Sequence, residues 1–526
     1  MVQSKDDKIQ RGPKSNAPLP DNLARYTLEK LRQHGDAVAL VYPELGGRQV
    51  TYGELARWSV AAASELGRLG LRPGSMLAVA SLGGPHFTPL FVGALLAGAV
   101  VAPFNPGFDD DEMRHVLGFL KPRVLIADEP NALYEKCSAT VLSSADVDAW
   151  LEDKAGSDVD VDPPVEAAQL ESPAAVLCSS GTTGYPKGVE ISHRALLQLL
   201  AVDNEEGMMI NAAFGSFLLM SPVFWVSSIM VHLLCLNSGA KIVALLRFNE
   251  QLFLKVLREY NVVNTTMPPY LGVKLCKMNP RPDLAPLKFI MFGGSVMDPA
   301  TQAEVQSKYN VTVAQVYGMT EMLMTMGCDY TKPTPLGSVG QPRRDVEVKV
   351  VDTHTGEALG PRQEGELCFR GPTVTRGYYD DPAATAAAFD ADGWFHTGDV
   401  GYYDDDGFFF ITDRIKDFIK YKGHHVPSAQ LEALLCRHPA VLEAAVVGVP
   451  DPLAAELPRA YVVLKPGEPA SEDQVAHFVD SQVSDHKKLR GGVVFIDRLP
   501  RTAAGKISKK LLTEELKKRG STATTN

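Results

Sequence analysis

Short apolar runs alternate with segments of helical character from about residue 50 to about residue 320. The runs MLAVAS (76–81) and RVLIAD (123–128) predict short buried strands, because strands covered on both faces are continuously apolar. Between them, FVGALLAGAVVAPF (91–104) predicts a helix that leads into another strand. Such alternation predicts an α/β architecture, in which helices pack over sheets.

The start of one helix can be placed from its capping residues. Thr51 and Glu54 stand three residues apart, so their hydroxyl and carboxylate can satisfy the orphan amides of a helix start. We expect this helix to end near Leu69, because Gly70 follows it.

The pattern changes after about residue 335. Short strands and Gly/Asp-rich turns follow one another up to about residue 412, as in GELCFRGP (365–372) and YYDDDGFFFITD (402–413). We interpret Asp404–Gly407 as a hairpin turn rather than a metal-binding loop, because the remaining ligands of a calcium loop are missing. A part built of strands and turns is therefore predicted after the α/β part.

A domain boundary near Asp413 is indicated by charge as well as by pattern. Residues 417–526 contain 16 Lys/Arg and 13 Asp/Glu, a balance of +3, and the rest of the chain carries −14. A small basic module attached to a large acidic one favours closure over an anionic ligand at their interface. Uneven surface charge explains the difference equally well.

One long stretch resembles a membrane span in its lack of charge. Residues 207–240 contain no Asp, Glu, Lys or Arg, and a transmembrane helix needs about 20 mainly apolar residues. Pro222, His232 and four serines interrupt the stretch, so a buried strand followed by a helix is the better interpretation. No integral membrane segment is predicted.

Composition narrows the class of protein. The chain of 526 residues is 45% hydrophobic and 22% charged, which predicts a folded protein with a substantial core. Its net charge of −11 argues against a protein whose whole chain binds nucleic acid, because such a protein should be basic. Seven scattered cysteines without a CxxC pair fit a reducing compartment. The first twenty residues are polar, so we expect a loose arm and no secretory signal peptide.

The strongest chemical signal is the segment SSGTTGYPKG (179–188). It follows the apolar run AAVLC (174–178) and precedes a helix expected to begin near His193. Glycines allow close backbone approach, hydroxyls and amides donate hydrogen bonds, and Lys187 neutralises charge, so the segment can wrap a polyphosphate. It is not a Walker A loop, and by composition alone a polar surface loop is the favoured interpretation.

Four further motifs stand along the chain: YGMTE (317–321), GWFHTGD (393–399), DRIK with IKYKG (413–423) and PRTAAGK (500–506). Together with SSGTTGYPKG they resemble the signature of the adenylate-forming (ANL) superfamily, which includes acyl-CoA synthetases, 4-coumarate:CoA ligases and firefly luciferases. All five occur in the family's order. The resemblance implies a large N-terminal domain of helix-covered β-sheets with a small β-barrel-like part, and a small mobile α+β C-terminal domain.

The resemblance assigns roles in adenylation to the matching residues. Thr320 would contact the α-phosphate, Glu321 and Thr183 would hold Mg²⁺, and Lys506 would reach the carboxylate and the α-phosphate as the acyl-adenylate forms. Asp399, with Arg414 beside it, would accept hydrogen bonds from the ribose hydroxyls. The residues implied to bind ATP phosphates are Ser179, Ser180, Gly181, Thr182, Thr183, Gly184 and Lys187, and those on the adenine side are Gly293, Gly294, Ser295, Tyr317 and Gly318.

The same resemblance implies a second step. In this superfamily the small domain rotates after adenylation, withdraws the terminal lysine and presents its YKG face. Lys416 would absorb the backbone change at the hinge, and Lys420, Lys422 and Gly423 would border the channel for the thiol arm of coenzyme A, with Lys420 taking part in catalysis. The implied division is a loose arm (1–20), a large AMP-binding domain (21–414), the hinge (415–416), a small C-terminal domain (417–515) and a tail (516–526).

Three positions depart from close luciferases and coumarate ligases. His425 stands where those relatives usually carry Gln, and because His titrates near neutrality the thioester-forming conformation could depend on pH. Val316 replaces a usual Gly and narrows the slot beside the adenine or the acyl group. Phe224 and Trp225 lie where those relatives have a His pair; Trp225 is either a gate of the acyl pocket or a core tryptophan with a paired indole N–H.

The predicted function is that of an ATP-dependent acid:CoA ligase with Mg²⁺. A hydrophobic carboxylic acid, fatty or aryl-propenoic, would become an acyl-AMP with release of pyrophosphate, and the acyl group would then pass to coenzyme A. The alternatives are a luciferase-like monooxygenase, which Trp225 in place of His disfavours, and a stand-alone adenylation enzyme for a carrier protein.

Two further classes are disfavoured. A non-catalytic binding protein on the same fold would not need every charged position of the motifs, and a serine hydrolase would need a GxSxG elbow, which is missing. We expect an intracellular, most simply cytoplasmic, protein; the C-terminus carries no SKL-type address, although the family includes peroxisomal members.

Overall fold

The structure is a computed structural model that describes residues 8–154, 169–179, 185–206, 215–278, 280–329, 332–422, 424–501 and 507–513. The chain divides into two compact units. The larger unit consists of Gln10–Val348 and Phe369–Phe395, and the smaller unit consists of Met1–Ile9, Lys349–Cys368 and His396–Asn526.

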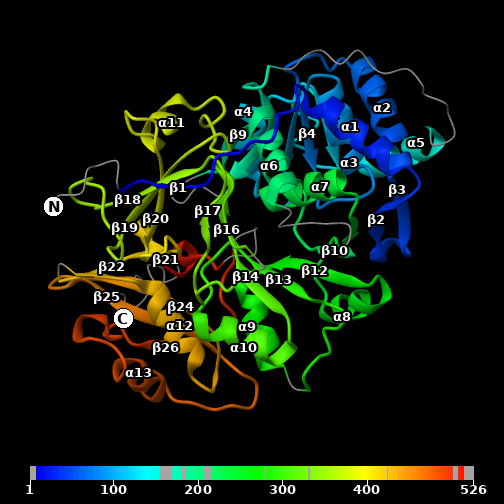
Figure 1. Ribbon diagram of the computed structural model, residues 1–526. Helices are drawn as coiled ribbons and strands as arrows, with labels where there is room; N and C mark the ends of the chain where they lie inside the picture. The colour runs from blue at the N-terminus through cyan, green and yellow to red at the C-terminus, as the bar shows by residue number, and fades with distance from the viewer. Residues whose placement is uncertain are drawn as a thin grey trace. The chain divides into compact units, whose positions relative to one another are not determined.

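A six-stranded sheet with the order β7-β6-β4-β5-β8-β9 lies in the larger unit (Figure 1). Its pairs are parallel except for the antiparallel pair of β8 and β9. Every residue of β4, β5 and β6 is buried, which explains their continuous apolar runs and confirms the predicted strands. The bounds are β4 Met76–Ala80, β5 Val100–Phe104, β6 Val124–Ala127, β7 Thr140–Ser143, β8 Pro173–Ser179 and β9 Lys187–Ser192.

One helix over this sheet begins at the residue that its cap predicts, whereas α3 begins at Phe87, before the predicted start at Phe91. Helix α2, Tyr52–Arg68, starts with a capping box in which the Glu54 amide donates to Thr51 Oγ1 at 3.1 Å and the Thr51 amide donates to Glu54 Oε2 at 2.7 Å. This confirms the predicted start and end of the helix. The other helices of this part are α1 Leu23–His34, α3 Phe87–Leu96, α4 Asp110–Leu120, α5 Ser144–Lys154 and α6 His193–Glu206.

The second large sheet has seven strands in the order β14-β13-β12-β10-β11-β2-β3, all parallel except the pair β2 and β3. Its strands are β2 Val38–Tyr42, β3 Arg48–Thr51, β10 Ser216–Leu219, β11 Lys241–Ala244, β12 Val262–Met267, β13 Phe289–Phe292 and β14 Thr312–Gln315. Its helices are α7 Val226–Ser238, α8 Glu250–Glu259, α9 Pro269–Lys277 and α10 Pro299–Tyr309.

The uncharged stretch contributes a strand and a helix to this sheet, as expected. Within it, β10 and α7 both contribute buried residues to the core. Among the described residues, no helix has the length and apolar character needed to cross a membrane.

Strands and turns dominate after residue 316, which is earlier than the predicted start near residue 335. Strands β15 Tyr317–Met319, β16 Leu323–Gly327 and β17 Gln341–Pro342 form a small antiparallel sheet. A five-stranded sheet has the order β1-β18-β19-β20-β21, with β1 Gln10–Arg11, β18 Glu347–Val351, β19 Gly365–Arg370, β20 Phe395–Tyr403 and β21 Phe409–Arg414.

The predicted hairpin turn at 404–407 is confirmed between β20 and β21. The Gly407 amide donates to the Asp404 carbonyl at 3.1 Å, and the side chain of Asp404 accepts from the amides of Asp406 and Phe408. Helix α11, Pro382–Ala388, was not predicted in this region.

The C-terminal part of the smaller unit is an α+β fold. Strands β23-β22-β25-β24 form a sheet, β26 pairs with β25 in parallel, and the core between sheet and helices is apolar. The elements are β22 Ile419–Tyr421, β23 His424–Val426, α12 Ser428–Arg437, β24 Val441–Asp451, β25 Ala455–Leu464, α13 Glu472–Asp480 and β26 Val493–Phe495.

The two compact units do not coincide with the division expected at residue 414. Residues 349–368 and 396–414 belong to the same unit as the C-terminal part. Two of the boundaries between the units fall within β18 and β19. The hinge at 415–416 and the other boundaries therefore stay predictions.

Candidate active site

The glycine- and hydroxyl-rich segment is flanked by two paired strands. Ser179, the last residue of β8, lies opposite Lys187, the first residue of β9, in the antiparallel register. Strand β9 was not predicted, but the helix after it begins at His193 as expected. Of the implied phosphate-binding residues, Ser180, Gly181, Thr182, Thr183 and Gly184 lie outside the described residues.

The last residues of this segment contact helix α4. The ring of Tyr185 stacks on His115 with centroids 5.0 Å apart, and His115 Nε2 lies 3.1 Å from the Pro186 carbonyl oxygen. Gly188 has no room for a side chain, since an added Cβ would lie 2.7 Å from the Phe119 ring. These contacts fix the strand that presents Lys187.

Tyr378 brings two of the predicted site residues together. Lys187 Nζ lies 4.9 Å from the centroid of the Tyr378 ring, a cation–π distance, and the Tyr378 hydroxyl donates to Glu321 Oε1 at 3.1 Å. Burial and the neighbouring Glu321 carboxylate raise the pKa of Tyr378 far above its usual value, so the phenol stays a donor at neutral pH.

Glu321 is a buried carboxylate in this arrangement. Only 6% of the residue is exposed, and its position is fixed by a 2.6 Å hydrogen bond from the Thr375 amide to its carbonyl oxygen. An ionised group that is largely removed from water favours a cation close by. Glu321 is therefore chemically suited to hold Mg²⁺, which prefers carboxylate oxygens.

The segment before α11 was missed as part of the site. The Thr375 hydroxyl donates to the Glu190 carbonyl at 2.6 Å and accepts from the Gly377 amide at 3.1 Å, so the segment is tied to β9 as well as to Glu321. Two adjacent tyrosines in a Gly/Asp-rich connection were the only signal in the sequence, and they do not show which of them faces Glu321.

The implied adenine-side residues come together at the ends of β13 and β14. Gly293 follows β13, and the Val316 amide donates to the Phe292 carbonyl at 2.9 Å. A Cβ added to Gly293 would lie 3.0 Å from Val316 Cγ2, so the unusual valine borders this glycine directly. Gly294, at φ +85°, adopts the left-handed conformation that glycine tolerates, and Ser295 follows it.

Tyr317 and Gly318 occupy the first positions of β15. The Tyr317 ring is buried, with its centroid 5.8 Å from that of Phe369. A Cβ at Gly318 would lie 1.9 Å from the Leu323 carbonyl oxygen, so only glycine fits this turn of the chain. Thr320 follows the strand and is half-buried beside Glu321 in sequence.

Asp399 and Arg414 lie side by side in the smaller unit. They are directly opposite in the register of β20 and β21, and Arg414 Nε is 2.7 Å from Asp399 Oδ1. Asp399 is only 4% exposed, and its amide donates to Thr397 Oγ1 at 3.0 Å. The pairing expected between these two residues is present, and their role in holding a ribose stays a prediction.

The three lysines expected to act after adenylation are exposed. Lys416 lies in the 3₁₀ turn Ile415–Asp417. The Lys420 amide donates to Glu456 Oε2 at 2.8 Å, which leaves its side chain at the surface of β22. Lys422 has φ +46° and its Nζ lies 5.5 Å from the Tyr421 ring centroid. Gly423 and Lys506 lie outside the described residues.

His425 is an exposed ring within a stack. Its centroid is 5.5 Å from that of Phe418 and 5.7 Å from that of His354, with interplanar angles of 13° and 22°. The pH dependence expected from His425 is not tested by this arrangement and stays a prediction.

The chain after the terminal motif is anchored by a half-buried cation. Lys509 Nζ lies 2.8 Å from Glu432 Oε1 and donates to Ser428 Oγ at 2.6 Å; Ser428 Oγ in turn lies 3.3 Å from Asp413 Oδ2. Burial lowers the pKa of Lys509, but the surrounding carboxylates outweigh it and hold the pKa above its usual value. This network joins the last described segment to α12 and to the residue before Arg414.

The two residues expected at the acyl pocket lie at the start of α7. Phe224 is buried and Trp225 is half-buried, and the Trp225 carbonyl accepts from the Ser228 amide at 3.0 Å. Trp225 is therefore not a fully buried core residue. Whether it borders an acyl group stays a prediction.

Comparison with known families covers most of the chain. Residues 28–379 match the family described as AMP-binding enzyme, and residues 430–506 match the AMP-binding enzyme C-terminal domain.

The chain belongs to the AMP-binding enzymes. It is similar to luciferin 4-monooxygenase of Nipponoluciola cruciata, with 32% identity over 98% of each chain. It is equally similar to 4-coumarate–CoA ligase 3 of Oryza sativa subsp. japonica, with 33% identity over 94% of this chain and 92% of the relative. The crystal structure of ATP-bound MatB from Rhodopseudomonas palustris superimposes with a TM-score of 0.86 at 26% identity, covering 94% and 99% of the two chains.

These matches confirm the resemblance to the adenylate-forming superfamily and the mixed α/β fold with a smaller C-terminal domain. AMP-binding enzymes bind ATP, and the protein is an enzyme of this family. Ligases and luciferases match at almost the same identity, so family membership alone does not decide between the two reactions.

Proposed function

We propose that this AMP-binding enzyme is an acid:CoA ligase that acts on a hydrophobic carboxylic acid. ATP and the acid would give an acyl-AMP and pyrophosphate, and coenzyme A would then take the acyl group as a thioester. The observation that carries the adenylation step is the cluster of Lys187, Tyr378 and Glu321, which holds a cation and a buried carboxylate at one place in the larger unit.

The cluster suits an Mg²⁺–triphosphate. Mg²⁺ supplies charge neutralisation when bound, and Glu321 offers it a carboxylate oxygen that Tyr378 orients. Lys187 and Ser179 lie opposite each other at the base of the glycine-rich segment, where they would neutralise and donate to the leaving pyrophosphate. We assign Thr320 to the α-phosphate, Thr183 to the metal, and Asp399 with Arg414 to the ribose.

Adenine is proposed to lie along the segment formed by Gly293, Gly294 and Ser295 and by Tyr317 and Gly318. Glycine at 293 and 294 permits close approach of a flat ring to the backbone. Val316 narrows the proposed adenine site, because its side chain fills the space beside Gly293.

Two lysines are proposed to act in turn. Lys506 would hold the carboxylate and the α-phosphate while the adenylate forms. Lys420, with Lys422 and Gly423, would then border the thiol arm of coenzyme A, and the exposed side chains of the two lysines suit an anionic partner of this kind. Rotation at Lys416 would exchange the two arrangements.

A hydrophobic acid is favoured by Phe224 and Trp225 at the start of α7. Trp225 stands where luciferases carry a His, so we favour the ligase over the luciferase-like monooxygenase. A carrier protein is the other candidate acceptor.

The reaction is proposed to take place in the cytoplasm. The seven cysteines all lie in described residues and none forms a disulfide, which suits a reducing compartment.

Release of pyrophosphate and AMP tests the proposal directly. The protein is given MgATP with straight-chain acids from short to long and with cinnamic-type acids, each with and without coenzyme A. We expect turnover that needs both an acid and coenzyme A. The acid with the fastest turnover shows which class of acid the acyl pocket accepts. Pyrophosphate release that coenzyme A does not accelerate would favour a carrier protein, light emission would favour the luciferase, and no release from folded protein would contradict adenylation.

A further inference from the structure

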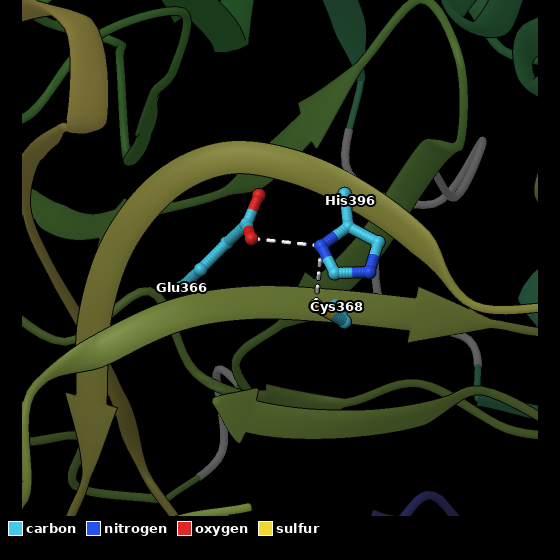
Figure 2. A group of neighbouring side chains, drawn as sticks. All are labelled: Glu366, Cys368 and His396. Carbon is cyan, nitrogen blue, oxygen red and sulfur yellow. Dashed lines mark hydrogen bonds and ion pairs between the residues drawn. The ribbon is translucent and has the colours of Figure 1, made fainter. Parts of the chain in front are cut away.

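Three different metal-binding side chains gather on two neighbouring strands of the smaller unit. Glu366 and Cys368 stand two residues apart on β19, so they point to the same face of the sheet, and His396 comes from the adjacent strand β20 (Figure 2). His396 Nδ1 lies 2.7 Å from Glu366 Oε2 and 3.4 Å from Cys368 Sγ. The carboxylate oxygen, the sulfur and the ring nitrogen all lie within 4.8 Å of one another.

The backbone around these side chains is held in place. Glu366 Oε1 accepts from the Gly398 amide at 2.9 Å, and the Thr397 hydroxyl donates to the Leu367 carbonyl at 2.8 Å. Cys368 is fully buried, whereas the side chain of His396 is 34% exposed. The thiol is therefore shielded from solvent, whereas the imidazole is partly in contact with it.

We propose that Glu366, Cys368 and His396 form a binding site for a divalent transition-metal ion of the zinc type. One imidazole nitrogen, one thiolate and one carboxylate are ligands that suit Zn²⁺ and Co²⁺, with water in the fourth position. Mg²⁺ prefers oxygen ligands, so this site differs in chemistry from the one at Glu321. The proposal does not depend on the reaction proposed above.

Two of the three distances require only a small adjustment, whereas the Glu366 oxygen and the Cys368 sulfur, which lie within 4.8 Å of each other, must come to about 3.6 Å. For tetrahedral zinc with usual bond lengths, nitrogen and sulfur are about 3.6 Å apart and nitrogen and oxygen about 3.3 Å apart. The observed N–S distance of 3.4 Å is already close to this value. The N–O distance of 2.7 Å is that of a hydrogen bond, so Glu366 and His396 must separate by a few tenths of an ångström as the ion replaces the shared proton.

Binding is balanced by the release of protons. Cys368 loses its thiol proton to become a thiolate, and His396 must carry its proton on Nε2 so that the Nδ1 lone pair faces the ion. Glu366 binds through Oε2 and keeps the hydrogen bond of Oε1 to the Gly398 amide. Affinity should therefore rise with pH, because each proton lost competes with the ion.

Cobalt titration tests the site in the full-length protein. The chain is stripped with a chelator, kept reduced with a phosphine, and titrated with Co²⁺ alone. We expect one ion per chain and the near-ultraviolet charge-transfer absorption of a cobalt–thiolate bond. Added Zn²⁺ should abolish this absorption, since zinc binds such ligands more tightly than cobalt.

Variants assign the signal to these residues. Cys368→Ala should abolish the charge-transfer absorption, whereas Cys436→Ala, which removes a half-buried thiol on α12, should keep it. Glu366→Gln preserves the shape of the side chain and should weaken cobalt binding by at least about tenfold, the loss that even an outer-sphere partner can cause. His396→Gln removes the proposed nitrogen ligand and should also weaken cobalt binding. His477→Gln, at an exposed position of α13, is its control and should bind cobalt as the native chain does.

Two results would overturn the site. One is the absence of any cobalt–thiolate absorption in the folded native protein. The other is a pair of findings on the variants. Cys368→Ala would retain the absorption, and Glu366→Gln, shown to be folded by circular dichroism, would bind cobalt with the affinity of the native chain. In either case Glu366 and His396 form an ordinary ion pair beside a buried cysteine.

Discussion

At the scale of single residues, Tyr378 links the charged groups of the candidate active site. Its ring lies under Lys187 and its hydroxyl donates to the buried Glu321 carboxylate. A phenol whose pKa is raised by burial and by a carboxylate remains a hydrogen-bond donor over the whole physiological range. Tyr378 is therefore placed to orient Glu321 rather than to transfer a proton.

Removing only the hydroxyl tests this role. We expect Tyr378→Phe to lower kcat about tenfold to a hundredfold and to raise the Mg²⁺ concentration needed, because a hydrogen bond to a charged group contributes about 1.5–3 kcal/mol. Steady-state pyrophosphate release over a range of Mg²⁺ measures both effects. Tyr379→Phe is the matched control on the adjacent residue. An unchanged Mg²⁺ dependence in Tyr378→Phe would show that Glu321 does not need this donor.

Two buried histidines predict how stability depends on pH. Burial lowers the pKa of His193 and of His232 from 6.5 to about 4. Between these values the unfolded chain binds protons that the folded chain does not, so stability is lost as the pH falls from about 6.5 to about 4. Each histidine then contributes a loss of roughly 3 kcal/mol at the acid end of this window.

Urea unfolding at pH 7 and at pH 4.5 measures the loss. We expect His232→Gln, which cannot take up a proton, to lose distinctly less stability between the two pH values than the native chain. The exposed His477→Gln is the control for removing an imidazole. An equal loss in His232→Gln and in the native chain would mean that His232 does not stay neutral in the fold.

Some neighbours at the candidate site could be predicted from the family resemblance of the sequence motifs, although the roles of these residues stay predictions. Asp399 and Arg414 were expected together, and the register of β20 and β21 places them opposite each other. Tyr378 could not be found in this way. It lies 57 residues after Glu321, and its contact depends on a long-range fold that no local pattern encodes.

At the scale of elements, the hairpin of β15 and β16 depends on one glycine. Gly318 approaches the Leu323 carbonyl so closely that an added Cβ would lie 1.9 Å from the oxygen, and backbone atoms cannot move aside as a flexible side chain can. Leu323 itself has φ +55°, so the partner strand is already constrained at the contact. The glycine of the YGMTE motif is thus required by the fold.

Substitution of this glycine tests how much the fold depends on it. We expect Gly318→Ala to lower the free energy of unfolding by about 1–3 kcal/mol, the usual range for overpacking. Gly327→Ala, on the partner strand with its nearest atom 3.8 Å from the added Cβ, should change it by less than about 0.5 kcal/mol. Urea denaturation of both variants measures the difference. Equal stabilities would contradict the close approach.

Element prediction succeeded where periodicity or capping is local and failed where tertiary pairing decides. Strands β4 and β6 and helix α2 have continuous apolar runs or a capping box, and their bounds agree with the structure. Strand β9 begins at Lys187 inside a motif that resembles a loop, and it forms because β8 offers an antiparallel partner. Helix α11 is too short and too exposed to give a hydrophobic period.

At the scale of the whole molecule, the two units carry different parts of the proposed chemistry. Lys187 and Glu321 belong to the larger unit, whereas Asp399, Lys416 and Lys420 belong to the smaller one. Within the smaller unit, half-buried Lys509 contacts Glu432 and donates to Ser428. Lys416 lies inside this smaller unit, so the rotation proposed at this residue would be a movement within the unit, carried by a few backbone positions.

Separate assays of the two half-reactions test whether different lysines serve them. We expect Lys506→Ala to lower ATP–pyrophosphate exchange about a hundredfold to a thousandfold, the loss seen when one charge-stabilising donor is removed. The same variant, supplied with preformed acyl-AMP, should still transfer the acyl group to coenzyme A. Lys420→Ala should show the reverse, and Lys487→Ala, which removes a lysine bonded to Gln430 in the same unit, should alter neither assay. If both site variants lowered both half-reactions equally, one arrangement of the active site would serve both steps, and the exchange of lysines by rotation at Lys416 would be wrong.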